Sequence, residues 1–201
     1  MNNEQFDIQL RIIKVDQKNS ELADLLRECR DISTEILISG NRQQLTSVFD
    51  IQREAADYFV VAQEIKAGQV VGSMALKNLD PGELFISATV VRLQFQGRGI
   101  SQEMMKYLEK HSSEYVEFSS HVTAGNPQST KSRIAMGFNI DPTWQDADGC
   151  LRFFKPVDQK KAEKTFQEAE TEIRVIFPKK KSMQNLNNKA PNNQTVGGNL
   201  V

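Results

Sequence analysis

The segment at residues 90–101 most constrains this chain, because it joins a strand to a helix through a glycine-containing turn. An apolar run precedes Gly97 and Gly99, and a helical pattern opens at Ser101. Glycine lets backbone N–H groups turn inward without obstruction by a Cβ atom. The first turn of the helix adds unpaired N–H groups and the positive end of its dipole. The segment therefore predicts an anion site suited to a pyrophosphate, with the positive charge of Arg98 beside it.

Two common nucleotide-binding motifs do not fit this segment. The third glycine of a dinucleotide-binding fingerprint is missing, since Gln102 stands in its place, and the chain has no Gly-Lys-Ser or Gly-Lys-Thr of an NTPase loop. The alternative interpretation is a helix-start turn in which the glycines are merely tolerated. The surrounding elements must therefore decide between these two interpretations.

Hydrophobic periodicity predicts a mixed sheet flanked by helices. Alternating apolar residues and turn signals such as Asp80-Pro81-Gly82 indicate strands over residues 8–15, 59–65, 70–76, 83–93, 115–122, 138–140 and 151–155. Helical spacing and capping residues indicate helices over residues 20–29, 42–58, 101–110, 127–137 and 158–173. Tight turns make consecutive strands antiparallel, whereas the strand–helix–strand unit over residues 83–122 is long enough for a parallel crossover. The predicted fold class is α/β or α+β, with helices on both faces of the sheet.

A second informative segment follows the strand predicted at residues 115–122. Asn126 and Pro127 cap and open a short helix, Gly137 ends it, and Phe138 opens the next strand. With the two segments in this order, the sequence resembles the GCN5-related N-acetyltransferase (GNAT) superfamily over about residues 6–157.

The phosphate-loop motif of that superfamily is Gln/Arg-x-x-Gly-x-Gly/Ala. The chain matches it from Gln96 to Ser101, except that serine replaces the small residue at the last position. A second register, from Gln94 to Gly99, matches every letter. The apolar run before the turn fits the first register better.

The resemblance implies an acyl-coenzyme A-binding fold: a mixed, mostly antiparallel sheet whose central parallel strands splay apart. The strand before the loop would pair with the pantetheine arm, and the N–H groups of the loop would hold the pyrophosphate. Asn126 would contact the cofactor, although its role as a helix cap alone would also explain it. Acetyl-CoA or another acyl-CoA is the implied cosubstrate, and no metal is expected. The implied cofactor-binding residues are Val91, Leu93, Gln96, Gly97, Arg98, Gly99, Ile100, Ser101, Asn126 and Ser129.

The chain departs from the family pattern at the usual catalytic acid. Family members often carry a tyrosine seven residues after the asparagine, which protonates the departing thiolate, but position 133 is arginine here. No tyrosine follows Tyr115. Arg133 could stabilise a thiolate electrostatically, or it could be a surface cation. Ser129, Ser132 or water could replace the missing acid.

A general base must take a proton from an ammonium acceptor, and Glu83 and His121 are the candidates. Glu83 begins the strand that leads to the glycine-containing turn. His121 lies near the C-terminal end of the parallel neighbour, where ligands of such sheets bind, and histidine titrates near neutral pH. The alternatives are an exposed acid next to a turn and a histidine satisfied at a sheet end. The predicted catalytic residues are thus Glu83, His121 and Arg133.

Composition argues against nucleic acid and membrane as partners. The chain has 201 residues and a net charge of −1, and residues 178–201 carry four lysines and no acid, so residues 1–177 stand at −5. This acidic body lacks the basic face that neutralises phosphates. No apolar stretch is long enough to span a bilayer and no signal peptide is evident, which predicts a cytoplasmic protein. The two cysteines have neither metal-ligand nor redox spacing.

The predicted domain organisation has three parts. They are an acyl-CoA-binding domain over residues 1–157, a helix and short strand packed on it over residues 158–177, and a disordered tail over residues 178–201. The predicted function is transfer of an acetyl or other acyl group from acetyl-CoA to a primary amine by direct attack. The alternative is a catalytically inactive acyl-CoA-binding or protein-interaction module. The amine could belong to a small molecule or a peptide, and a monomer or homodimer is expected.

Overall fold

The structure of the protein is a computed structural model that describes residues 6–15, 23–24, 27–29, 31–32, 56–79, 81–123, 125–145, 149–166 and 173–177. The helix predicted over residues 20–29 is helical at each of its described residues. The helix predicted over residues 42–58 lies outside the described residues up to residue 55, and Tyr58 already belongs to a strand. The tail predicted over residues 178–201 also lies outside them.

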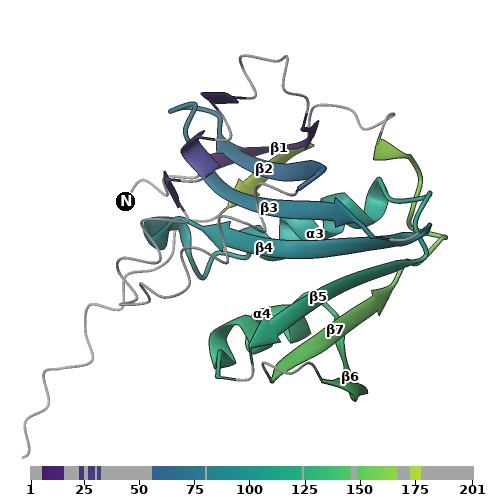
Figure 1. The fold of residues 1–201 in the computed structure, drawn as a ribbon. Helices are drawn as coiled ribbons and strands as arrows, with labels where there is room; N and C mark the ends of the chain where they lie inside the picture. Colours follow the sequence, from purple (N-terminus) through teal and green to yellow (C-terminus); the bar gives the residue numbers. More distant parts are fainter. Residues whose placement is uncertain are drawn as a thin grey trace, which may run out of the picture.

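Eight strands of the described chain form one sheet in the order β6-β7-β5-β4-β3-β2-β1-β8 (Figure 1). Among these strands only β4 and β5 are parallel, and every other neighbouring pair is antiparallel. This arrangement confirms the predicted mixed sheet with a central parallel pair. The strands are β1 (Phe6–Lys14), β2 (Tyr58–Glu64), β3 (Val70–Asn78), β4 (Glu83–Val91), β5 (Glu117–Thr123), β6 (Asn139–Gln145), β7 (Cys150–Pro156) and β8 (Ile173–Phe177).

Two described helices position the site, α3 (Ile100–Lys110) after β4 and α4 (Pro127–Ala135) after β5. The buried residues of α3 include Ile100, Met104 and Leu108. Their spacing of four places them on one side of the helix, so α3 lays an apolar stripe on the sheet. The same helix supplies the crossover that a parallel pair of strands requires.

Buried apolar side chains form two clusters, and alternation along β2 shows that they lie on opposite faces of the sheet. Val60 and Ala62 belong to the cluster that contains the α3 residues, whereas Phe59 and Val61 belong to the other cluster. Successive side chains of a strand point to opposite faces. The second cluster also holds Cys29, which is helical, so helices cover both faces as predicted.

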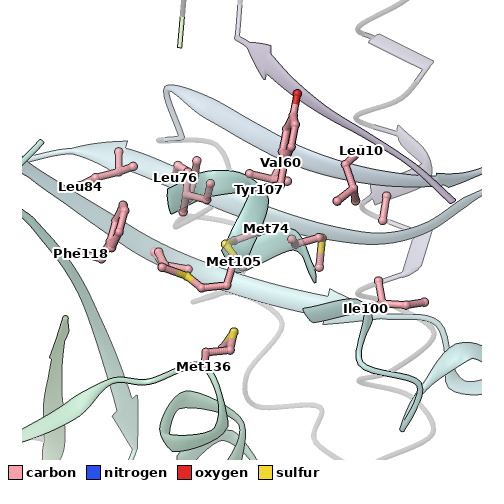
Figure 2. Packing of buried hydrophobic residues seen from close by; sticks show 14 of the residues in the cluster. Leu10, Val60, Met74, Leu76, Leu84, Ile100, Met105, Tyr107, Phe118 and Met136 are labelled. Carbon is pink, nitrogen blue, oxygen red and sulfur yellow. The ribbon is translucent and has the colours of Figure 1, made fainter. Parts of the chain in front are cut away.

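The cluster under α3 contains most of the large buried side chains. In Figure 2, Met105 and Tyr107 of α3 lie against the sheet near Met74 and Leu76 of β3. Phe118 of β5 belongs to the same cluster and is fully buried. This packing anchors α3, and with it the turn at its N-terminus, to the centre of the sheet.

A β-bulge in the β3–β4 ladder changes the face to which β4 residues point. Leu76 is opposite Ile86 but Ala75 is opposite Ala88, so Ser87 is an extra residue on β4. Ile86 accordingly belongs to the cluster under α3, whereas Ala88 belongs to the opposite cluster. Beyond the bulge, Thr89 therefore faces the same side as α3.

The parallel pair β4–β5 separates after three residues. Glu83, Leu84 and Phe85 pair with Glu117, Phe118 and Ser119, and no ladder continues beyond them. The hydroxyl of Ser120 still donates to the Ile86 carbonyl at 2.9 Å. From there β4 continues along β3 and β5 along β7, and the two strands diverge in Figure 1. We call this diverging part of β4 and β5 the split, and it confirms the predicted splayed strands.

The helix predicted over residues 158–173 is wrong for its described part. Residues 158–166 form a turn followed by an irregular segment, and residues 167–172 lie outside the described chain. The N–H groups of Glu163 and Lys164 donate to the Lys110 carbonyl at the end of α3, so they are not available for a helical ladder. Phe166 packs edge-on against Tyr58 at 4.9 Å, which holds this segment against the sheet.

Two predicted boundaries also shift around the glycine-containing turn. The strand predicted to run to residue 93 ends at Val91, because a 3-10 helix, η2 (Leu93–Phe95), turns the chain there. The helix predicted from Ser101 begins one residue earlier, at Ile100.

Candidate functional site

The turn between β4 and α3 presents backbone N–H groups at the start of a helix. Gly97 and Gly99 have φ angles of 70° and 85°, a region that L-residues with a side chain rarely adopt. Gly99 is the N-cap residue of α3, and its carbonyl accepts the hydrogen bond from Glu103 N–H at 3.0 Å. The N–H groups that precede Glu103 in the helix have no intrahelical acceptor. We call residues 96–101 the glycine loop.

Side chains of the turn hold the glycine loop in this shape. Gln96 Nε2 donates to the Val91 carbonyl at 2.9 Å, and Arg98 donates to the Gln94 carbonyl at 3.1 Å. The Arg98 guanidinium also lies 5.6 Å from the centre of the Phe95 ring. The side chains of Gln96 and Arg98 thus stabilise the conformation of the turn.

The glycine loop fits an anionic group. A Cβ atom added to Gly99 would meet only Gln102 Oε1, at 3.7 Å, so the space before the helix is open. The loop itself contains no acid, and the nearest acid in α3, Glu103, is paired with Lys106 at 2.7 Å. The positive end of the helix dipole is therefore not cancelled by a carboxylate in the loop.

The other residues predicted to bind the cofactor near the turn differ in exposure. Ile100 and Val91 are buried in the cluster under α3, so their side chains face the core. Leu93 is 45% exposed in η2 and lies outside the strand ladder. Ser101 is half-buried in the first turn of α3.

Asn126 caps α4, as its sequence context predicts. Its side-chain oxygen accepts from Ser129 N–H at 3.1 Å, and its carbonyl accepts from the Thr130 hydroxyl at 3.2 Å. Pro127 follows at the first helical position, where no N–H is needed. Ser129 thus touches Asn126 through its backbone.

Replacing Asn126 with alanine is expected to lower the free energy of unfolding by about 1 kcal/mol, because the first turn of α4 loses its cap. Thermal and urea unfolding of the full chain measure this loss. Asn126→Ser is the matched control, since serine also caps helices and should restore most of the stability. If Asn126→Ser is stable but binds acetyl-CoA as poorly as Asn126→Ala, the asparagine is a cofactor ligand as well as a cap.

Arg133 is buried, so the alternative of a surface cation is wrong. The residue is 6% exposed, and its guanidinium donates to the Thr89 hydroxyl at 3.0 Å and lies 5.8 Å from the centre of the Phe138 ring. Burial lowers the pKa of Arg133 to about 10. Because Thr89 is in the split, α4 places a positive charge between β4 and β5. The bulge that turns Thr89 toward Arg133 leaves no signal in the sequence.

Glu83 lies at the closed end of the split and belongs to an ion-pair cluster. Arg152 of β7 contacts Glu83 at 3.4 Å, Glu117 at 2.5 Å and Asp141 at 3.5 Å. Hydrogen bonds from Thr143, together with Arg152, hold the pKa of Asp141 below its usual value. Glu83 is about 26 Å along the strand from Val91, at about 3.3 Å per residue. The structure therefore does not bring Glu83 together with the glycine loop.

His121 lies on β5 within the split and is exposed. Its ring packs edge-on against Phe85 at 5.0 Å and stacks on Trp144 of β6 at 4.3 Å. This aromatic contact could not be derived from sequence, because the three residues come from three strands. Thr89, which is also in the split, was missed for the same reason, and so was the buried Ser119, which still pairs with Phe85 at the closed end.

The arrangement of a glycine loop beside splayed parallel strands agrees with comparison to known proteins. The sequence profile described as the Acetyltransferase (GNAT) family matches residues 20–138, which is more than half of the chain. The chain therefore belongs to the GNAT acetyltransferase family. No curated protein sequence matches it significantly.

Solved structures of distant sequence share the fold. A ribosomal-protein-S5-alanine acetyltransferase from Vibrio fischeri is 15% identical, with a TM-score of 0.54 over 75% of this chain and 93% of that one. Ard1 from Thermoplasma volcanium is 16% identical, with a TM-score of 0.52 over 74% of this chain and 98% of that one. At these identities the likeness establishes the fold alone.

Within the described ranges, no group of three or more His, Cys, Asp or Glu residues is placed to hold a metal ion. No helix in the same ranges is both long and apolar enough to cross a bilayer.

Proposed function

We propose that the protein transfers an acetyl group from acetyl-CoA to a primary amine by direct attack. The observation that carries this proposal is the glycine loop at the start of α3, immediately beside the split between β4 and β5. The loop N–H groups bind the pyrophosphate, and the pantetheine arm lies along the separated part of β4, where backbone groups have no partner in β5. Membership of the GNAT family supports acetyl-CoA as the acyl donor.

The reaction needs a base that takes a proton from the acceptor and a group that stabilises the negative charge on the departing sulfur. The amine nitrogen attacks the thioester carbon, the C–N bond forms, the C–S bond breaks, and the nitrogen gives up a proton. We assign proton removal to His121, which is exposed within the split, in preference to Glu83, which Arg152 holds at the closed end. The Arg133 charge stabilises the thiolate until solvent protonates it.

A second candidate function is acyl-CoA binding without turnover. The observation that favours it is Arg133 in the position where family members often have tyrosine, since guanidinium is a poor proton donor at neutral pH. Both functions predict acyl-CoA binding, and they differ in whether thiol is released.

Calorimetric titration of the full chain with acetyl-CoA, followed by a thiol-release assay over a panel of amines, tests the proposal. We expect micromolar binding and release that depends on an added amine. Binding without amine-dependent release would favour the binding module. Absence of binding to acetyl-CoA and to free coenzyme A would contradict both functions.

A further inference from the structure

Arg133 is a buried cation to which the described chain supplies no anion. Its side-chain contacts in the described residues are the Thr89 hydroxyl and the Phe138 ring, both uncharged. Arg152 shows the contrast, because three carboxylates lie within 3.5 Å of it. A charge removed from water without a partner is costly to the folded protein. A bound anion would offset that cost.

The place of this cation is defined by the two elements that it joins. Arg133 extends from α4, which follows β5, to Thr89 on β4. It therefore bridges the split, two residues before the end of β4 and the turn to the glycine loop. An acyl-CoA whose phosphates bind at the loop extends its acyl end into the split, where Arg133 lies.

The guanidinium has donors left for a ligand. It carries five N–H donors in a planar fork, and the Thr89 hydroxyl accepts from one nitrogen. A planar fork matches the two oxygens of a carboxylate, which it can bind in a bidentate manner. A departing thiolate becomes negative only as the C–S bond breaks. In the complex with acyl-CoA before the reaction, it therefore gives the Arg133 guanidinium no anionic partner.

We propose that the acyl donor bears a carboxylate at its far end, as malonyl-CoA and succinyl-CoA do, and that Arg133 binds this carboxylate. The inference rests on the proposed acyl-CoA function and narrows it to dicarboxylic acyl groups. Thr89 orients the guanidinium by accepting its hydrogen bond. The Phe138 ring covers the cation and keeps water from it.

Matched pairs of ligands test the proposal by binding alone. Malonyl-CoA and propionyl-CoA have acyl groups of equal length, as do succinyl-CoA and butyryl-CoA, and each pair differs by a carboxylate in place of a methyl group. We expect calorimetry to show that the carboxylate tightens binding by about 10- to 100-fold in the better-fitting pair, as for a hydrogen bond to a charged group. Arg133→Gln should abolish this difference.

Two further variants keep the test specific. Arg133→Lys keeps the charge and should retain part of the preference, which guards against a folding defect in Arg133→Gln. Arg152→Gln removes an arginine that pairs with Glu83 and Glu117 at the closed end of the split, and it should leave the preference unchanged.

Three results would overturn the proposal. The first is equal affinity within both pairs. The second is an affinity for free coenzyme A that falls in Arg133→Gln as much as that for the dicarboxylic ligands, because Arg133 would then bind coenzyme A itself. The third is no binding of any coenzyme A species, which would remove the proposed function as well. The first of these results, obtained with tight binding of propionyl-CoA and butyryl-CoA, would overturn this inference alone.

Discussion

Replacing Gly97 with glutamate is expected to abolish coenzyme A binding while the protein stays folded. Gly97 has a φ angle of 70°, and a side chain there costs about 1–2 kcal/mol of stability. The new carboxylate would stand in the glycine loop, where the pyrophosphate is proposed to bind, so repulsion adds to steric exclusion. We expect the dissociation constant for acetyl-CoA to rise by about 100-fold or more, since two to three hydrogen bonds to charged phosphate are lost.

Gly68→Glu is the matched control for this change. Gly68 has a φ angle of 67° in the turn between β2 and β3, and a Cβ atom added there would meet nothing within 4 Å. The control therefore introduces the same charge at nearly the same backbone angle, outside the loop. Calorimetry should show unchanged binding for Gly68→Glu. Equal loss of binding in both variants, or retained binding in Gly97→Glu, would contradict the assignment of the glycine loop.

Replacing Phe118 with alanine is expected to produce the largest loss of stability. Its side chain is fully buried in the cluster under α3, and β5 carries it at the closed end of the split. Truncating a buried phenylalanine removes apolar burial and leaves a cavity, at a cost of about 3–5 kcal/mol. For a domain of this size we expect Tm to fall by about 6–20 °C. Differential scanning calorimetry measures the change.

Val116→Ala is the neighbouring control for Phe118→Ala. Val116 is 66% exposed, and its truncation should change the free energy of unfolding by no more than about 0.5 kcal/mol. A small effect of Phe118→Ala, comparable to that of Val116→Ala, would show that the cluster under α3 does not hold β5 in place.

Features fixed by neighbours along the chain could be predicted from sequence. The glycine loop depends on Gly97 and Gly99, whose backbone angles are a local property. The Asn126 cap and Pro127 likewise act within one turn of helix. The splayed strands were predicted only through resemblance to a family, because periodicity does not show where a ladder ends.

Features made by residues far apart in sequence could not be predicted. The sequence leaves a surface cation open as the role of Arg133, because no nearby residue indicates that the β4 bulge turns Thr89 toward it. It likewise leaves Glu83 open as an exposed acid, but Arg152 on another strand pairs with it. The helix predicted over residues 158–173 had a suitable pattern, and bonds from Glu163 and Lys164 to Lys110 override it.

The pairing of β8 with β1 has a consequence for the order of folding. Asp7 lies opposite Ile176, so this pairing closes a loop that contains almost all other described residues. The entropic cost of closing a loop grows with the logarithm of its length, and each doubling of the length adds only about 0.6 kcal/mol. The length of this loop therefore lowers the stability of the folded protein only slightly. Contacts between distant residues nevertheless form slowly. The strands and helices around the glycine loop and the split are joined by shorter connections. We therefore expect the glycine loop and the split to form before β8 pairs with β1.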